Sequence, residues 1–195
     1  MLTPFAITKE NQLHSGMVYI NPGQEFAGKP ATSFPLYIRI KSYIYTCGLA
    51  EEVPLEKVGM NKKMRELLRV TLGERIEIEL YEGPGDPYLG ELEMELELGV
   101  ITENQQVVDI EDTLLADAIR KLHLYKYFKD GQCVVLPFNT ALLVATVSKV
   151  IPTDRNGRLG PDTKLTFVSK GNQKLKLKSQ KQKTQAIFQS NFKIE

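Results

Sequence analysis

The residues that could carry acid–base, metal or nucleophilic chemistry are few and lie far apart in the sequence. The histidines are His14 and His123, and the cysteines are Cys47 and Cys133. Neither histidine has a cysteine or carboxylate at the spacing of a zinc site. Neither cysteine has a neighbourhood that would activate a thiolate nucleophile. We therefore expect no metal site and no catalytic residue in this segment, which we predict to be non-catalytic.

Simple structural roles are available for the same residues. Cys47 and Cys133 each lie inside an apolar run, which predicts reduced thiols in a hydrophobic core rather than a disulfide. His123 comes at the end of a helical pattern, so we expect it at the surface or near the helix end. The acidic residues at 109–112 precede that helix, where negative charge is favourable near its positive end.

The sequence contains no recognisable nucleotide-binding motif. The glycines never form the phosphate-binding pattern G-x-x-x-x-G-K-[ST], and no G-x-G-x-x-G pattern opens a helix after a strand. No G-x-S-x-G turn for a nucleophilic serine is present either. We therefore expect no cofactor in this segment.

Charge gives little reason to expect a nucleic acid or an anionic membrane as partner. The 25 basic and 24 acidic residues give a net charge of +1, so an electrostatic partner must meet a local patch. The lysine-rich stretch from Lys170 to Lys183 could neutralise phosphates. It contains no aromatic residue for base stacking and no arginine. We interpret it as a solvated strand and linker, with a lysine-tail nucleic-acid binder as an alternative.

Export and membrane insertion are not predicted. The amino terminus Met1–Phe5 lacks a charged stretch followed by an apolar one, and no later run reaches the ~20 apolar residues of a membrane span. The sequence therefore predicts a cytoplasmic protein.

Most of the predicted elements are strands. Tyr37–Tyr45, Ile76–Glu82 and Leu89–Leu98 alternate apolar and polar residues, the period of a half-buried strand. Further strands are predicted at Gln132–Phe138 and Leu142–Ile151.

Two helices and one boundary complete the predicted organisation. Asn61–Leu68 is predicted as a short helix with Asn61 as its N-cap. A longer helix follows Asp112, with Leu114, Leu115, Ala118, Ile119 and Leu122 on one face. The polar stretch Thr102–Asp109 is predicted to separate two subdomains, which indicates a β-rich α+β fold.

The segment Met60–Ile78 resembles the second half of a double-psi β-barrel, as found in the N-terminal domains of AAA ATPases. It combines a short helix, apolar residues, a turn at Gly73 and an alternating strand. Phe138-Asn139, the lysine-rich stretch and Asn191-Phe192-Lys193 are similar to the second subdomain of the N-ethylmaleimide-sensitive factor family and to its exit into the first ATPase ring. The resemblance extends over almost the whole chain.

This resemblance implies a domain plan. A double-psi β-barrel subdomain would occupy residues 1–100, and a small α/β subdomain would occupy 108–188, with a groove between them. Residues 189–195 would begin a linker to an absent AAA ATPase domain, so the chain would be a piece of a longer polypeptide. ATP, Mg²⁺ and hexamer formation would belong to those absent ATPase rings.

The resemblance also implies a function. Domains of this family bind a SNAP-type adaptor, which brings SNARE complexes to the ATPase for disassembly in vesicle fusion. The family presents basic residues to an acidic adaptor, which here indicates Lys62, Lys63, Arg65 and Arg69 as partner-binding residues. Two basic positions of the family are replaced, by Glu66 and by the uncharged pair Ile101-Thr102. Recruitment to vesicle and Golgi membranes would be peripheral and through partners.

Two alternatives remain open. A valosin-containing-protein-type N-domain, which binds ubiquitin-pathway cofactors, is compatible with the segment from Met60 to Gly73. A free-standing barrel enzyme is also conceivable, but the sequence contains no self-processing serine and no paired carboxylates to support it.

Overall fold

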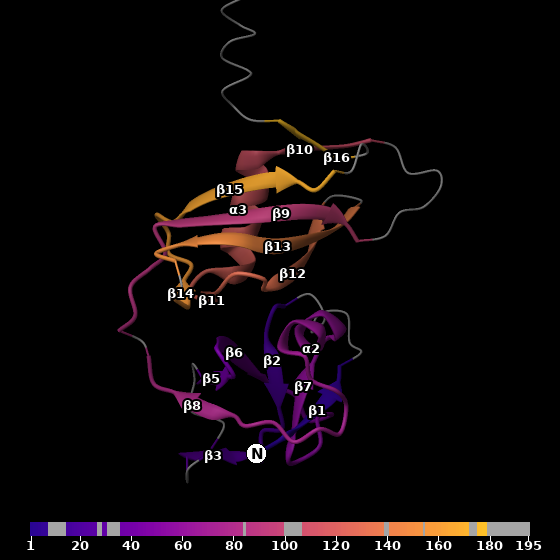
Figure 1. Cartoon of the computed structure of the whole chain (residues 1–195), viewed down its shortest axis with the longest axis vertical. Coiled ribbons are helices and arrows are strands. Elements are labelled where there is room, and N and C mark those ends of the chain that lie inside the picture. The colour runs from indigo at the N-terminus through magenta and orange to yellow at the C-terminus, as the bar shows by residue number, and fades with distance from the viewer. Residues whose placement is uncertain are drawn as a thin grey trace, which may run out of the picture.

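The chain folds into two lobes that are stacked along its long axis (Figure 1). The computed structural model describes residues 1–7, 15–26, 29–30, 36–83, 85–99, 107–138, 141–153, 155–171 and 175–178. Each lobe has its own hydrophobic core, one built from residues between Leu2 and Ile76 and the other from residues between Leu89 and Leu175. The described part is β-rich, with helices α2 and α3, in agreement with the predicted α+β class.

The first lobe is a six-stranded mixed sheet with the order β1-β7-β2-β6-β5-β8. Its strands are β1 (Thr3–Ala6), β2 (Val18–Ile20), β5 (Leu36–Ile40), β6 (Tyr43–Leu49), β7 (Lys57–Met60) and β8 (Glu79–Tyr81). β1 pairs with β7 in parallel, and β2 pairs with β6 in parallel, whereas the other pairings are antiparallel. Between β2 and β5 in the sequence, β3 (Glu25–Phe26) and β4 (Lys29–Pro30) form a separate antiparallel pair.

One segment connects the two edges of this sheet. Ile76 exchanges backbone hydrogen bonds of 3.0 and 2.8 Å with Leu2, which directly precedes β1. A few residues later, β8 pairs with β5 at the opposite edge. The sheet therefore curves around its core, where the largest fully buried side chains include Ile20, Ile38 and Met60.

The second lobe is built on a four-stranded sheet with the order β12-β13-β9-β15. Its strands are β9 (Glu91–Leu98), β12 (Cys133–Phe138), β13 (Ala141–Ile151) and β15 (Lys164–Ser169). Two short pairs accompany it: β10 (Val108–Glu111) with β16 (Leu175–Lys178), and β11 (Tyr127–Phe128) with β14 (Gly157–Arg158). Helix α3 (Asp112–His123) covers one face of the sheet (Figure 1).

The strand β9 is in the second lobe. It lies between β13 and β15, and its inward side chains, among them Leu92 and Leu96, belong to the second core. The chain therefore changes lobes between Tyr81 and Leu89, which differs from the predicted barrel range of 1–100. Alternation shows which residues of a strand face inward, but it does not show which sheet the strand joins.

The outward side of β9 carries an acidic stripe formed by Glu91, Glu93, Glu95 and Glu97. Glu91 forms an ion pair with Lys164 at 3.0 Å, and Glu97 forms one with Lys170 at 2.9 Å. Lys164 of β15 and Lys170, which follows that strand, thus neutralise part of the stripe, as exposed ion pairs commonly do on a protein surface.

The predicted strand Tyr37–Tyr45 is a hairpin. Lys41 has a left-handed backbone with φ of 54°, and the chain reverses there, so that β5 pairs with β6. The prediction of one strand was wrong because this turn contains no glycine or proline to mark it. The predicted strand Ile76–Glu82 is also shorter, consisting of the Ile76 bridge and β8.

Candidate functional site

Helix α2 (Lys62–Leu68) carries the predicted partner-binding residues. The side chain of Asn61 accepts a hydrogen bond of 2.8 Å from the backbone N–H of Met64, which confirms the predicted N-cap. Met64 and Leu68 lie one turn apart and are buried in the first core. Arg69 ends the helix in a left-handed conformation with φ of 50°. The opposite face of α2 is therefore turned to solvent.

The four predicted cations are not equivalent. Lys62 and Lys63 are exposed and lie 3.8 and 3.6 Å from the carboxylate of Glu66. Arg69 is exposed, and no ion pair involves it among the described residues. Arg65 is half-buried, and its guanidinium donates a 2.7 Å hydrogen bond to the carbonyl of Met60. Arg65 thus holds the start of its own helix, while the other three present charge to solvent.

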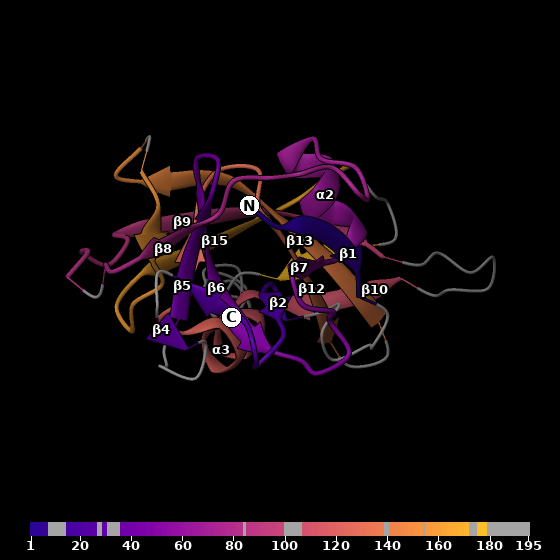
Figure 2. The same ribbon diagram turned by 90° about the horizontal axis from the view of Figure 1, so that it is seen from below.

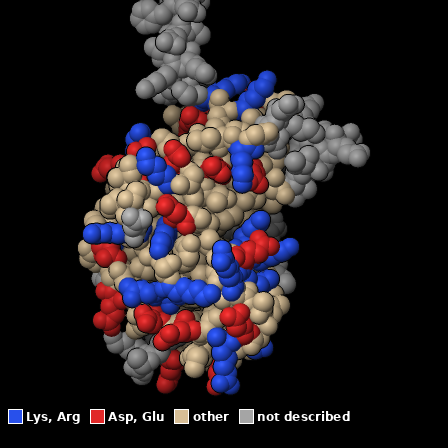
Figure 3. All heavy atoms as spheres, viewed as in Figure 1, with Lys and Arg blue, Asp and Glu red and all other residues tan. Residues whose placement is uncertain are grey.

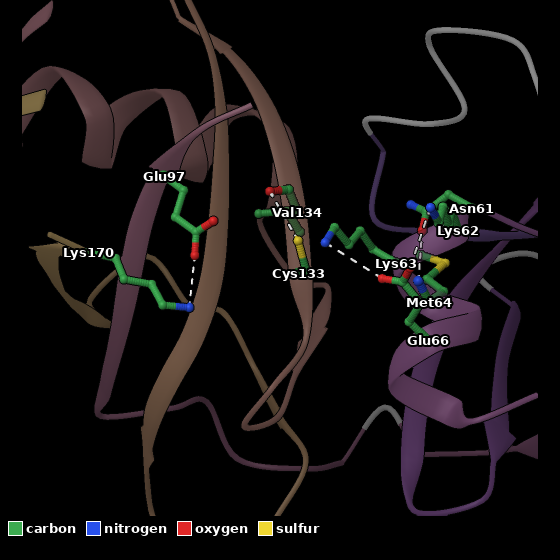
Figure 4. A network of polar contacts seen from close by, with 9 residues as sticks. All are labelled: Asn61, Lys62, Lys63, Met64, Glu66, Glu97, Cys133, Val134 and Lys170. Atoms are coloured by element: carbon green, nitrogen blue, oxygen red, sulfur yellow. Dashed lines mark hydrogen bonds and ion pairs between the residues drawn. The ribbon is translucent and has the colours of Figure 1, made fainter. Parts of the chain in front are cut away.

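The α2 patch, defined here as Lys62, Lys63 and Arg69, carries net positive charge beside the second lobe. Lys63 extends from α2 toward β12, the strand that contains Cys133 (Figure 4). Elsewhere on the face in Figure 3, basic and acidic side chains are interspersed. Glu66 offsets one of the three charges at close range, so the patch is modestly cationic. The replaced family position at Ile101-Thr102 lies outside the described residues.

The seam where the lobes meet is formed by aromatic side chains. Tyr127 of β11 is buried and meets the rings of Tyr37 and Tyr81 edge to face, with ring centres 5.1 and 5.8 Å apart. Its hydroxyl donates to the Gly83 carbonyl at 2.5 Å and lies 2.9 Å from an Asp86 carboxylate oxygen. Edge-to-face aromatic pairs add stability beyond their buried area. The seam is therefore a packed interface that includes the connection between the lobes.

Polar contacts extend this seam around the turn of the β5–β6 hairpin. The side chain of Asn156 accepts from the backbone N–H of Ile44 at 3.0 Å and donates to the carbonyl of Ser42 at 2.8 Å. Lys129 donates to the same Ser42 carbonyl at 3.1 Å. A cavity of about 10 Å³ remains in the seam, between Tyr45 and Met64 of the first lobe and His123 and Phe128 of the second.

His123 is the last residue of α3, in keeping with its predicted place near the helix end, but it is buried in the seam and does not lie at the surface. It is 1% exposed and stands one turn after Ile119 on the inward face of α3. Burial, and secondarily the charge of Lys126, lowers the pKa of His123 to about 3. Burial also lowers the pKa of Lys126 to about 8, and its ammonium donates a 2.8 Å hydrogen bond to the carbonyl of Ser15 in the first lobe.

The cysteines have different surroundings. Cys47 is buried in the first core, and burial raises the pKa of its thiol to about 12. Cys133 is partly exposed, and its pKa is also raised, mainly by burial. Both are free thiols, and a raised pKa makes a thiol a poorer nucleophile at neutral pH. The prediction of a core residue is confirmed for Cys47 and holds only in part for Cys133.

A surface cavity of about 640 Å³ in the first lobe was not predicted. Its walls come from four separate segments: Met1–Thr3, Gln24–Glu25, Leu55–Lys57, and Arg75 with Ile78. It lies at the end of the molecule that carries the N-terminus in Figure 1. No sequence motif unites these segments, so only the tertiary fold reveals the cavity. Its lining has both acidic and basic residues.

The described part of the chain shows neither a metal-binding cluster nor a membrane-spanning helix. Among those residues, no three histidine, cysteine or acidic side chains gather closely enough to hold a metal ion. No described helix combines the length and apolar character needed to cross a bilayer. In the view from below, the first lobe lies in front of the second (Figure 2).

Comparison with known proteins gives no family assignment. No protein-family model matches the chain, and no curated protein sequence matches it significantly.

Proposed function

We propose that this chain is the N-terminal adaptor-binding domain of an AAA ATPase of the N-ethylmaleimide-sensitive factor type. Its task would be to bind a SNAP-type adaptor and so recruit SNARE complexes for disassembly by ATPase domains elsewhere in the parent protein. The observation that carries the proposal is the α2 patch: exposed cations on a rigidly capped helix, next to the seam between two lobes.

The architecture supports this proposal. The resemblance implies a β-barrel in the first subdomain. The first lobe has a six-stranded sheet with two parallel pairs, and one segment connects its edges. A second lobe with a four-stranded sheet and one covering helix suits the small α/β subdomain. Fold analogy is weak evidence for a function by itself, so the surface chemistry of α2 bears most of the proposal.

The electrostatics of the α2 patch suit an acidic partner that binds and dissociates. Exposed cations at the rim of an interface mainly raise the association rate and select the partner. Their effects decrease as salt screens them. The proposed domain would therefore act as a reversible docking surface, cytoplasmic and recruited to vesicle membranes only through the adaptor.

A binding comparison between two adaptor classes tests the proposal. The immobilised chain is exposed to a purified SNAP-type adaptor and, separately, to a ubiquitin-pathway cofactor of valosin-containing protein. We expect retention of the SNAP-type adaptor and no retention of the cofactor. The reverse result would favour the valosin-type alternative, and retention of neither would refute an adaptor-binding function of either type.

Charge reversal of the α2 patch should weaken adaptor binding. Each exposed cation contributes about 0.5–1 kcal/mol, so reversal of Lys62, Lys63 and Arg69 to Glu should reduce affinity by about tenfold to a hundredfold. The dependence of affinity on salt should also diminish. Isothermal titration calorimetry at two salt concentrations measures both effects. Arg65 is left intact because its guanidinium supports the helix start.

A matched control reverses three exposed lysines of the second lobe, Lys121, Lys149 and Lys176. It makes the same change in net charge at a distance from α2. Equal loss of affinity in both variants would mean that overall charge, and not the α2 patch, attracts the adaptor. Thermal unfolding of the α2 variant should remain within a few degrees of the wild type, since exposed substitutions cost little stability.

A further inference from the structure

Two residues with buried polar atoms, one from each lobe, line the same small cavity in the seam: Tyr45 on β6 and His123 on α3. Neither the Tyr45 hydroxyl nor Nε2 of His123 makes a hydrogen bond of 3.5 Å or less to a described residue, although the Gln132 side chain also interacts with the Tyr45 hydroxyl. Tyr45 is 3% exposed and His123 is 1% exposed. A buried polar group without a partner costs about 1–3 kcal/mol. Two such groups on one cavity point to a shared ligand.

We propose that this cavity is a binding site for a single water molecule, which connects the Tyr45 hydroxyl with Nε2 of His123 across the seam. The cavity measures about 10 Å³, close to the smallest space that holds one water, roughly 10–15 Å³ on this measure. A buried water also needs at least about two polar partners. The Tyr45 hydroxyl and Nε2 of His123 supply them, and the space excludes a larger ligand.

The hydrogen-bond roles at His123 follow from Lys126. The Lys126 ammonium lies 3.4 Å from Nδ1 of His123, and an ammonium can only donate. Nδ1 therefore accepts, and the ring proton of the neutral imidazole is on Nε2. That N–H donates to the water oxygen, and the water then pairs with the Tyr45 hydroxyl, which can donate or accept.

Other polar side chains on the cavity are already engaged. The amide nitrogen of Gln132 donates to the carbonyl of Ile44 at 3.4 Å, and its amide oxygen accepts from the backbone N–H of Lys129 at 2.7 Å. Lys126 donates to Ser15. The remaining walls include Met64, Leu67, Phe128 and Val134. The proposed water would therefore lie between residues of both lobes and form part of their interface.

A crystal structure of this chain at a resolution that orders internal waters tests the proposal. We expect one density peak within hydrogen-bond distance of both the Tyr45 hydroxyl oxygen and Nε2 of His123. A dry cavity would overturn the proposal, and so would a direct hydrogen bond between the two side chains. Neither outcome bears on adaptor binding, so the test is independent of the proposed function.

Variants at two neighbouring tyrosines sharpen the test. Tyr45→Phe removes one of the water's two partners, so the peak should disappear while the fold is kept. Tyr43→Phe is the matched control because the Tyr43 hydroxyl donates to the Asp130 carbonyl at the exposed rim, and the peak should remain. Persistence of the peak in Tyr45→Phe, or its loss in Tyr43→Phe, would contradict the bridging role of Tyr45.

Discussion

Acidification should destabilise the wild-type chain more steeply than a His123→Gln variant. The unfolded chain binds a proton at His123 below about pH 6.5, whereas the folded chain resists protonation until about pH 3. Between these values the unfolded state holds more protons, so acid favours unfolding. The contribution of His123 is fully present above about pH 6.5. It is lost as pH falls, by about 1.4 kcal/mol per pH unit.

Urea denaturation at several pH values between 7 and 4 measures this slope, and subtraction of the variant removes the carboxylate titrations common to both proteins. Lys126 does not interfere, because its lowered pKa of about 8 affects stability at higher pH. Titration of His123 near pH 6.5 in the folded protein, seen by NMR, would contradict its burial in the seam.

Substitution of Tyr127 by alanine should cost about 3–5 kcal/mol of unfolding free energy, as for other large buried aromatic residues. The ring is 4% exposed and packs against Tyr37 and Tyr81 of the first lobe. Its hydroxyl interacts with Gly83 and Asp86 in the connection between the lobes. Removal of the side chain therefore opens a cavity and also leaves polar groups without their partner. Urea denaturation of the variant and the wild type measures this loss of unfolding free energy.

Two further variants separate the causes. Tyr127→Phe keeps the ring and removes only the hydroxyl, so it should cost about 1–3 kcal/mol. Tyr125→Ala changes an exposed tyrosine two residues earlier and should cost less than about 1 kcal/mol. If Tyr127→Ala cost no more than Tyr125→Ala, the seam could not be the packed interface described here.

Local patterns in the sequence predicted the local structure well. The Asn61 cap and helix α2 follow from residue type and position, and β9 follows from strict alternation. The burial of His123 could also have been predicted from the sequence. Leu115, Ile119 and His123 are spaced four residues apart and therefore lie on the same, inward face of α3. The exposed Leu114 and Leu122 had widened the predicted face and hidden this register.

Features that depend on distant contacts could not be predicted from the sequence. The placement of β9 between β13 and β15 depends on pairings with residues more than 40 positions away. The sequence did not show that Arg65 supports the start of its own helix. Its guanidinium donates to the backbone carbonyl of Met60, and residue types alone do not show which backbone group a side chain will contact. The residues of the seam come from separate segments and meet only in the folded chain.

The central claim, that the α2 patch docks an acidic adaptor, is tested most directly by NMR. The isotope-labelled chain is titrated with a purified SNAP-type adaptor, and the perturbed backbone amides are mapped on the structure. We predict that the strongest changes fall on Lys62–Arg69 and on the adjoining strand β12, and that added salt reduces them. Changes confined to the first-lobe cavity around Leu55 and Ile78, or no changes at all, would contradict the claim.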